Sequence, residues 1–343
     1  MKSKKQFFSV LIAAIGMVVL IIDSKTAMTA AANGIDMCIR TVIPSLFPFF
    51  VVSNMLIGAL TGTAVSFIRP FTRCLGVPEG GESILLIGLL GGYPVGAQCI
   101  ASLHKNKQIN ASDARRLLGF CSNAGPAFIF GIVSRNFTNA EYIWAIWLIH
   151  MISSFLVGAF LPGKRDYRIN HVSQKTAGFT DVLKGAITTT AIVCGWVVIF
   201  RIIIAFLERW FLWLLPDMVQ HLLVGMLELV NACAKLPSIE CEGLRLCLCS
   251  CFLALGGACV AMQTVSVTER VGTGLYFPGK ILQAGFSFAL TYLYQAVRFT
   301  STNRFYLPHF ALLIILFAAV LFSFKVFRSK KTVAFQRDIV YNR

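Results

Sequence analysis

Charge is scarce in this sequence. Only 13% of its 343 residues are charged, against about 25% in a typical soluble domain, whereas 57% are hydrophobic. The apolar residues stand in long runs that short charged loops separate. This composition excludes an ordinary soluble domain and predicts an all-α, polytopic membrane protein that lies in the lipid bilayer.

Acidic residues are scarcer than basic ones, 15 against 31, which gives a net charge of +16. Such an excess would suit nucleic acid, but the basic residues cluster at the ends of apolar runs, at 2–5, 105–116, 164–168 and 325–337. This placement is typical of the positive-inside rule. We therefore expect no nucleic-acid partner, a multi-pass protein of the cell membrane, and cytoplasmic N- and C-termini.

Signatures of catalysis and metal binding are also missing. The sequence has no H-E-x-x-H, P-loop, G-x-G-x-x-G or G-x-S-x-G motif. Of its 11 cysteines, those at 241–259 cluster without a histidine nearby, which favours small packing residues over disulfides or zinc ligands. The sequence thus predicts a protein that is not an enzyme and holds no cofactor and no metal.

The apolar runs divide the chain into two similar halves. Residues 85–98 align weakly with 222–235, as expected for the internal repeats of transporters. We predict about eight transmembrane helices and two re-entrant or broken-helix segments in an inverted repeat. The predicted parts are an N-terminal transmembrane helix (1–23), a first membrane repeat (24–161), a basic linker (162–180), a second membrane repeat (181–298), a last transmembrane helix (299–326) and a basic C-terminal tail (327–343).

The first 60 residues are predicted to form two helices, and the first of them allows an alternative. The apolar run at 7–22 resembles a signal peptide, but the small residues at 30–32 lie well beyond it, which favours an uncleaved helix. The second helix is predicted at 41–60, where Pro44 and Pro48 bend its first turns.

Loop charges favour re-entry of the two broken segments. If every run crosses the bilayer, the basic loops at 104–116 and 162–175 fall outside, against the positive-inside rule. If the segments at 85–103 and 222–236 re-enter, both loops fall inside. Each half then has an odd number of crossings, so the halves insert with opposite orientation. Full crossing of these segments stays the alternative.

The segment at 85–103 begins as an apolar helix and then interrupts itself with Gly-Gly-Tyr-Pro. Pro94 removes a backbone donor and Gly92 loosens the helix, so nearby carbonyls lose partners that lipid cannot replace. Such a break is tolerated only where protein or a wet cavity surrounds it. We predict solute contacts from Gly92, Tyr93, Pro94 and Gln98, with an interfacial position as the alternative for Tyr93.

A second interruption reads Ser-Asn-Ala-Gly-Pro at 122–126. Pro126 suits the first turn of a half-helix, and Ser122 or Asn123 can cap it. The N-terminus of a half-helix carries free N–H groups and a partial positive charge, which suit an anion. Ser122, Asn123 and Gly125 are therefore predicted to bind solute, with helix capping as the alternative.

Ionisable residues inside the second half are further candidates. Glu228, Asn231 and Lys235 share one helical face at i, i+3 and i+7, and an ionisable group at membrane depth costs about 2.5–3.5 kcal/mol. We predict that Glu228, Asn231 and Gln263 contact the solute or a coupling ion. The alternative is a Glu228–Lys235 ion pair. Arg201 is expected either to snorkel or to contact an anion.

Four motifs resemble a known family. They are Pro-Ser-Leu-Phe-Pro-Phe-Phe at 44–50, Gly-Gly-Tyr-Pro-Val-Gly-Ala at 91–97, Cys-Ser-Asn-Ala-Gly-Pro at 121–126, and Glu228 with Asn231. They resemble the sporulation integral membrane proteins of the YlbJ/SpoVV type, within the wider group with Gate or nucleoside-recognition domains. The resemblance implies a sporulation role, with dipicolinic acid moved across a membrane around the forespore. The second-half match is looser.

These observations predict an integral membrane transporter for a small anionic solute, which works by alternating access at broken helices and couples to H⁺ or Na⁺. Two alternatives remain: a non-transporting scaffold or assembly protein for the spore envelope, and a nucleoside-type permease. The solute, the coupling ion, the direction of transport and the oligomeric state stay open.

Overall fold

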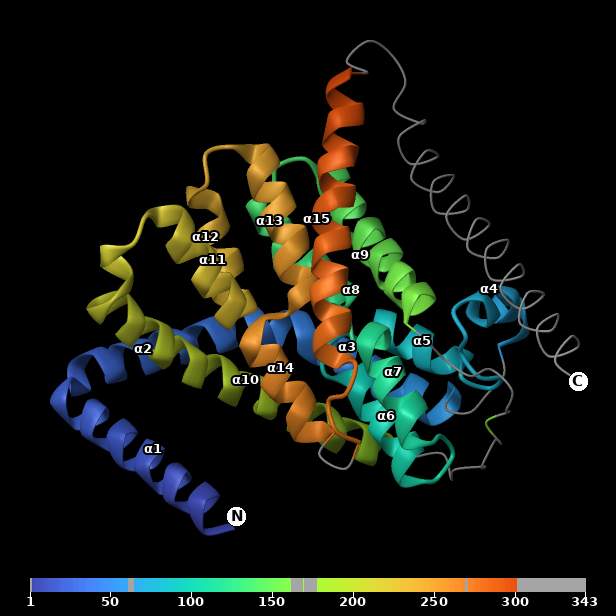
Figure 1. The fold of residues 1–343 in the computed structure, drawn as a ribbon, viewed down its shortest axis with the longest axis horizontal. Coiled ribbons are helices and arrows are strands. Elements are labelled where there is room, and N and C mark those ends of the chain that lie inside the picture. Colours follow the sequence, from blue (N-terminus) through green and yellow to red (C-terminus); the bar gives the residue numbers. More distant parts are fainter. Residues whose placement is uncertain (1, 61–64, 162–168, 170–177, 269–270, 301–343) are drawn as a thin grey trace, which may run out of the picture.

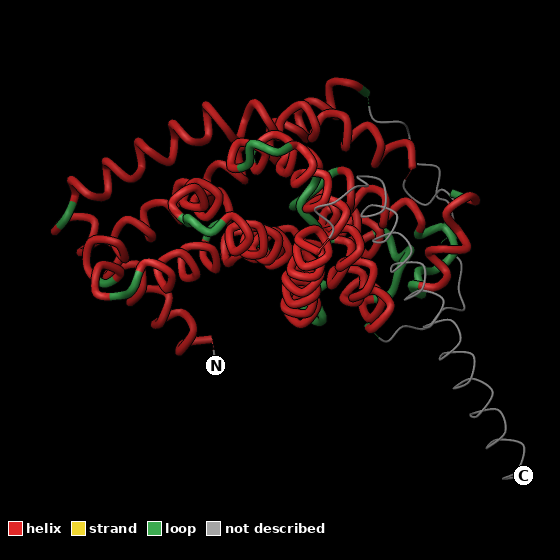
Figure 2. Tube along the Cα trace, turned by 90° about the horizontal axis from the view of Figure 1, so that it is seen from above, coloured by secondary structure: helices red, strands yellow, loops and turns green. Residues whose placement is uncertain are grey.

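The computed structural model describes residues 2–60, 65–161, 169, 178–268 and 271–300. Within these residues every regular element is helical (Figures 1 and 2), which confirms the predicted all-α class. The predicted last transmembrane helix lies outside the described residues from 301 onward, as do the basic tail and most of the linker at 162–180.

One long helical segment takes the place of the helix predicted at 41–60. After α1 (Lys2–Ile22) come α2 (Ser24–Met37), the π-helical turn η1 (Cys38–Val42) and α3 (Ile43–Leu60), and the last three run on without a loop. Pro44 therefore lies inside the segment rather than near its start. A prolyl ring clashes with the carbonyl four residues before it, and a wider π turn at that point accommodates the clash.

Two pairs of short helices fold back as hairpins. α5 (Glu82–Leu90) and α6 (Val95–Lys105) pack so closely that a Cβ on Gly96 would stand 2.9 Å from the Cα of Gly88. α11 (Asp217–Leu227) and α12 (Leu229–Lys235) meet at Glu228. His221 Nε2 lies 2.7 Å from Ser238 Oγ, so the start of α11 stands beside the end of α12. This geometry fits the predicted re-entrant segments, although their entry and exit on one side of the bilayer stay a prediction.

Two further helices are interrupted by short non-helical segments. α7 (Ala111–Cys121) is separated from α8 (Pro126–Gly131) by residues 122–125. α13 (Glu242–Leu255) is separated from α14 (Gly257–Val267) by Gly256 alone, whose φ of 75° lies in the left-handed region that favours glycine. Pro126 occupies the first turn of α8, as predicted. Each half of the chain thus contains one hairpin and one interrupted helix.

Three long helices frame these elements. α9 (Ala140–Phe160), α13 and α15 (Tyr276–Thr300) stand side by side, whereas α10 (Phe179–Trp210) runs across them along α2 and α3 (Figure 1). α3 packs against α8, and α10 packs against α14. In each half, the helix that precedes the hairpin (α3 or α10) therefore contacts the second part of the interrupted helix (α8 or α14). The remaining elements are the short helices α4 (Arg69–Cys74), η2 (Ser66–Ile68), η3 (Val133–Asn136), η4 (Leu212–Leu214) and η5 (Leu236–Ser238).

Four helical segments of the described chain are long and apolar enough to cross a membrane. They are Ser24–Leu56, Ala140–Phe160, Phe179–Trp210 and Glu242–Val267. Lipid-facing side chains such as Ile199 (51% exposed) and Ile203 (41% exposed) agree with this assignment. These spans support a membrane protein, while the predicted total of eight crossings and the inverted repeat stay predictions.

Arg116 lies inside the protein, although the sequence places it at the end of the basic cluster at 105–116. Its side chain is buried and donates hydrogen bonds to the carbonyls of Leu75, Gly76, Gly158 and Leu161. A planar guanidinium with five N–H donors suits such a cluster of carbonyls. Arg116 therefore joins the end of α4 to the end of α9.

Candidate functional site

Three of the four interruptions, together with α14, surround a small cavity of about 40 Å³. Its walls come from the α5–α6 link, the α7–α8 link, the α11–α12 junction and α14, and α3 and α10 close it. Five predicted site residues line it: Gly92, Tyr93, Gly125, Glu228 and Gln263. The rest of the lining is mainly apolar and includes Val42, Leu46, Phe50, Phe128, Val193 and Val197. Breaks that lie far apart in sequence therefore form one site.

Glu228 is the N-cap of α12 rather than a residue on its face. Its Oε1 accepts a hydrogen bond from the backbone N–H of Val230 (3.0 Å), and its Oε2 accepts from the backbone N–H (2.6 Å) and the side-chain amide (2.7 Å) of Asn231. Glu228 and Asn231 are thus in contact, as their spacing predicted, but through a helix cap rather than one helical face, because the helix begins after Glu228. Lys235 instead pairs with Glu208 at 2.7 Å. The N–H groups offered to a solute anion already bind the protein's own carboxylate.

Replacing Glu228 by alanine should lower the free energy of unfolding by about 1–2 kcal/mol, because an N-cap is lost. Glu228→Gln keeps one acceptor oxygen for the same N–H groups, so its loss should be smaller. Thermal unfolding of both purified variants in detergent measures the difference. Equal destabilisation would mean that the charge, and not the cap, holds α12 in place.

The first two breaks touch through their backbones. A Cβ on Gly92 would stand 2.8 Å from the backbone nitrogen of Gly125, and one on Gly125 would stand 2.9 Å from the Cα of Gly92. Gly92 also has a φ of 73°. The next residue, Tyr93, precedes a cis peptide bond to Pro94 and is buried between the cavity and α15. The two glycines therefore set how closely the breaks approach.

A buried lysine stands directly behind Tyr93. Lys280 of α15 is 1% exposed, and its Nζ donates to Tyr93 Oη (3.2 Å), Asn123 Oδ1 (3.3 Å) and Gln283 Oε1 (2.7 Å). All three acceptors are neutral, and among the described residues no carboxylate forms an ion pair with this ammonium group. A buried cation without a counter-charge is costly, so a lysine at this position either gives up its proton or binds an anion.

Lys280 and Gln283 were not predicted as site residues, although the sequence carries a periodic signal for them. The polar residues Lys280, Gln283, Ser287 and Thr291 recur at spacings of three and four, and all are fully buried in α15. Such a stripe lies on one face of a helix. A buried polar stripe in an apolar helix indicates a face that turns toward other protein or a cavity.

Asn123 connects this lysine to the second break. Its Oδ1 also accepts from Gln283 Nε2 (2.9 Å), and its Nδ2 donates to the carbonyl of Phe120 (2.8 Å) and to Ser154 Oγ (3.1 Å). Asn123 is completely buried and does not line the cavity. The predicted residue is therefore part of the layer behind the cavity wall.

The other predicted residues lie farther from the cavity surface. Gln98 Nε2 donates to Thr189 Oγ1 of α10 at 3.3 Å. The hydroxyl of Ser122 is buried and has no hydrogen-bond partner among the described residues. His150 Nε2 accepts a hydrogen bond from the backbone N–H of Ala124 (3.1 Å), and so holds the second break.

The described residues contain no group of three or more His, Cys, Asp or Glu side chains that could hold a metal ion. None of the 11 cysteines, all of which lie in the described part of the chain, forms a disulfide. The polar groups near the cavity are instead amides, hydroxyls, one carboxylate and one ammonium. This set is suited to binding a polar or charged organic solute.

Comparison with known proteins gives one informative similarity. Over 157 residues the chain is 34% identical to the sporulation integral membrane protein YlbJ of Bacillus subtilis strain 168. The aligned region covers 44% of this chain and 38% of that protein. The match thus spans well under two thirds of the relative's length. No protein-family profile matches the chain, and no solved structure matches it. The resemblance predicted from the motifs is confirmed: this chain is similar to a sporulation integral membrane protein of the YlbJ type.

Proposed function

We propose that this protein moves a small anionic solute across a membrane during sporulation, with dipicolinic acid as the candidate, by alternating access at its broken helices. The observation that carries the proposal is Lys280, a buried ammonium group whose three partners are neutral oxygens. A carboxylate that reached Tyr93 from the cavity would lie close to Lys280 and supply the missing counter-charge. A scaffold would gain nothing from such a costly residue.

The cavity walls suit the body of such a solute. Phe50, Phe128 and the valines of α10 provide apolar surface, while the Gly92–Gly125 contact leaves backbone close to the cavity. A planar aromatic acid could lie against these walls with a carboxylate toward Tyr93. This favours an aromatic carboxylate over a nucleoside, whose sugar hydroxyls would need more polar partners.

Glu228 is the proposed site of the coupling ion. Its carboxylate is buried at the cavity, and no cation pairs with it among the described residues. Binding of H⁺ or Na⁺ there would neutralise a charge that is otherwise costly to bury. The Glu228 carboxylate at the cavity and the Lys280 ammonium behind Tyr93 could therefore respond to coupling ion and solute separately.

The inverted repeat is part of the proposal. A hairpin, an interrupted helix and a long helix that contacts it occur in each half, in the same chain order. In alternating access one such unit rocks against the other around a fixed site. At about 40 Å³ the cavity has room for only a few water molecules, so the proposal requires a second conformation in which it is larger.

Uptake of labelled dipicolinate into proteoliposomes tests the proposal. We expect uptake that a pH or Na⁺ gradient accelerates, little uptake of a labelled nucleoside, and a loss of gradient dependence in Glu228→Gln. Asn123→Ala should weaken uptake, because it removes one acceptor of Lys280. Absence of flux for every candidate solute, with the protein correctly folded, would favour the envelope scaffold instead.

A further inference from the structure

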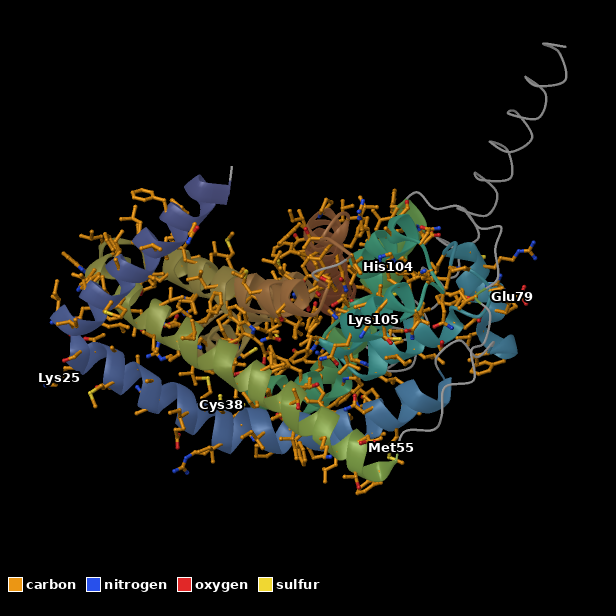
Figure 3. All side chains as sticks on the ribbon, turned by 90° about the horizontal axis from the view of Figure 1, so that it is seen from below. Lys25, Cys38, Met55, Glu79, His104 and Lys105 are labelled. Atoms are coloured by element: carbon orange, nitrogen blue, oxygen red, sulfur yellow. The ribbon has the colours of Figure 1, made fainter. Side chains whose placement is uncertain are left out.

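A second and larger pocket lies between α2 and α10, outside the proposed solute site. It measures about 320 Å³. The side chains that matter for its chemistry are Asp23, Lys25, Thr26, Asn33, Arg201 and Arg209. In Figure 3, Lys25 marks this end of the molecule, on the opposite side of the view from His104 and Lys105. We call it the arginine pocket.

Carboxylates hold both arginines in place at the pocket wall. Arg201 Nη1 lies 3.1 Å from Glu208 Oε2, and the other oxygen of Glu208 lies 2.7 Å from Lys235 Nζ. Arg209 Nε lies 3.0 Å from Asp23 Oδ2. Each ion pair engages one nitrogen of its arginine, and a guanidinium has five N–H donors. Further donors therefore remain for a ligand in the pocket.

The charges around the pocket do not cancel. Lys25, Arg201, Arg209 and Lys235 are four basic groups, and Asp23 and Glu208 are two acidic ones, which leaves two positive charges. The hydroxyls of Thr26 and Thr29 and the amide of Asn33 add neutral donors on the α2 wall. Two guanidinium groups, together with threonine hydroxyls and an amide, are well suited to bind the oxygens of a phosphate.

The pocket opens where lipid headgroups are expected. α10 ends next to Arg209 in exposed aromatic residues, Trp210 (37%), Phe211 (57%) and Trp213 (66%). Exposed tryptophans mark the interface between bilayer and water. Met28 of α2 (74% exposed) and Ile203 of α10 (41% exposed) lie one helical turn or more from these aromatic residues, and both present apolar side chains. A headgroup in the pocket would thus leave its acyl chains beside these residues.

We propose that the arginine pocket binds the phosphate of an anionic phospholipid headgroup. The lipid links α2 to α10 by accepting hydrogen bonds from Arg201, Arg209 and Lys25, and it neutralises the excess positive charge. Basic pockets between membrane helices bind anionic headgroups for the same electrostatic reason. The proposal does not depend on which solute the protein carries. It also gives Arg201 the anion contact that its sequence position left open.

Native mass spectrometry of the full-length protein tests the proposal, with phosphatidylglycerol and phosphatidylcholine as probes. We expect retained phosphatidylglycerol on the wild type and little phosphatidylcholine. The double variant Arg201→Gln/Arg209→Gln should bind phosphatidylglycerol about twenty-five-fold more weakly, at about fivefold for each basic group removed. Arg40→Gln is the matched control, because Arg40 is an exposed arginine paired with Asp36 outside the pocket. Its affinity should equal that of the wild type.

A second variant covers the case in which the double variant does not fold. Lys25→Gln breaks no ion pair among the described residues and should weaken phosphatidylglycerol binding about fivefold. Thermal stabilisation by inorganic phosphate alone, lost in Lys25→Gln, would assign the same phosphate chemistry to a soluble source. Equal phosphatidylglycerol affinity in the wild type, Lys25→Gln and any folded double variant would overturn the proposal.

Discussion

Lys280→Met should abolish dipicolinate uptake while the protein stays folded. The substitution leaves an unbranched side chain that is one atom shorter, and it removes the charge and all three donors. Hydrogen bonds to charged groups are worth about 1.5–3 kcal/mol each, so the loss of two such bonds to a carboxylate lowers flux by at least about a hundredfold. Uptake per reconstituted protein, measured over a range of dipicolinate concentrations, gives the size of the loss.

The stability of the same variant separates transport from folding. An apolar side chain of similar volume often costs nothing in place of a buried charge, so the unfolding temperature of Lys280→Met should equal or exceed that of the wild type. Lys184→Met is the matched control, because Lys184 is an exposed lysine of α10 outside the cavity lining, and it should transport normally. Undiminished uptake by Lys280→Met would show that the solute anion is bound elsewhere.

Gly92→Ala should cause the largest loss of stability among these substitutions, at least about 3 kcal/mol. A non-glycine residue held at positive φ costs about 1–3 kcal/mol, and the new Cβ would also stand 2.8 Å from the backbone nitrogen of Gly125. The new Cβ is fixed to the backbone of residue 92, and the atoms that it meets belong to the backbone of Gly125. No side-chain rotation relieves this contact, so the two breaks must separate.

Unfolding of Gly92→Ala in detergent, compared with that of Gly195→Ala, tests this expectation. Gly195 lies within α10, and a Cβ there meets nothing within 4 Å. Gly195→Ala should therefore be neutral or stabilising by up to about 1 kcal/mol, because alanine favours the helix. Similar stability of the two variants would contradict a close backbone contact between the breaks.

The location of the helix breaks could be predicted from the sequence, because proline and glycine act on their own neighbourhood. Pro94 and Pro126 lie at the starts of α6 and α8, as their missing N–H groups require. Long apolar runs likewise predicted membrane helices, since lipid exposure depends on the composition of the run itself. The convergence of three breaks and α14 on one cavity was expected only through the analogy with transporter repeats.

The partners of the charged residues could not be predicted in this way. Spacing suggested that Glu228 and Lys235 share a face, but Glu228 ends one helix arm and caps the next, while Lys235 pairs with Glu208 of α10. Lys280 lies within the predicted second membrane repeat (181–298), and its spacing to the other polar residues of α15 does not reveal its partners. Its burial depends on Tyr93 and Asn123, which lie more than 150 positions away in the chain.

The sequence by itself determined that this is an all-α membrane protein with breaks after Leu90 and Cys121, because hydropathy and backbone preference are properties of a few consecutive residues. Only the tertiary structure decided that Lys280 is enclosed by neutral oxygens and that Glu228 caps a helix at the cavity. Burial and charge compensation are set by side chains that folding brings together from distant positions, and no local pattern records them.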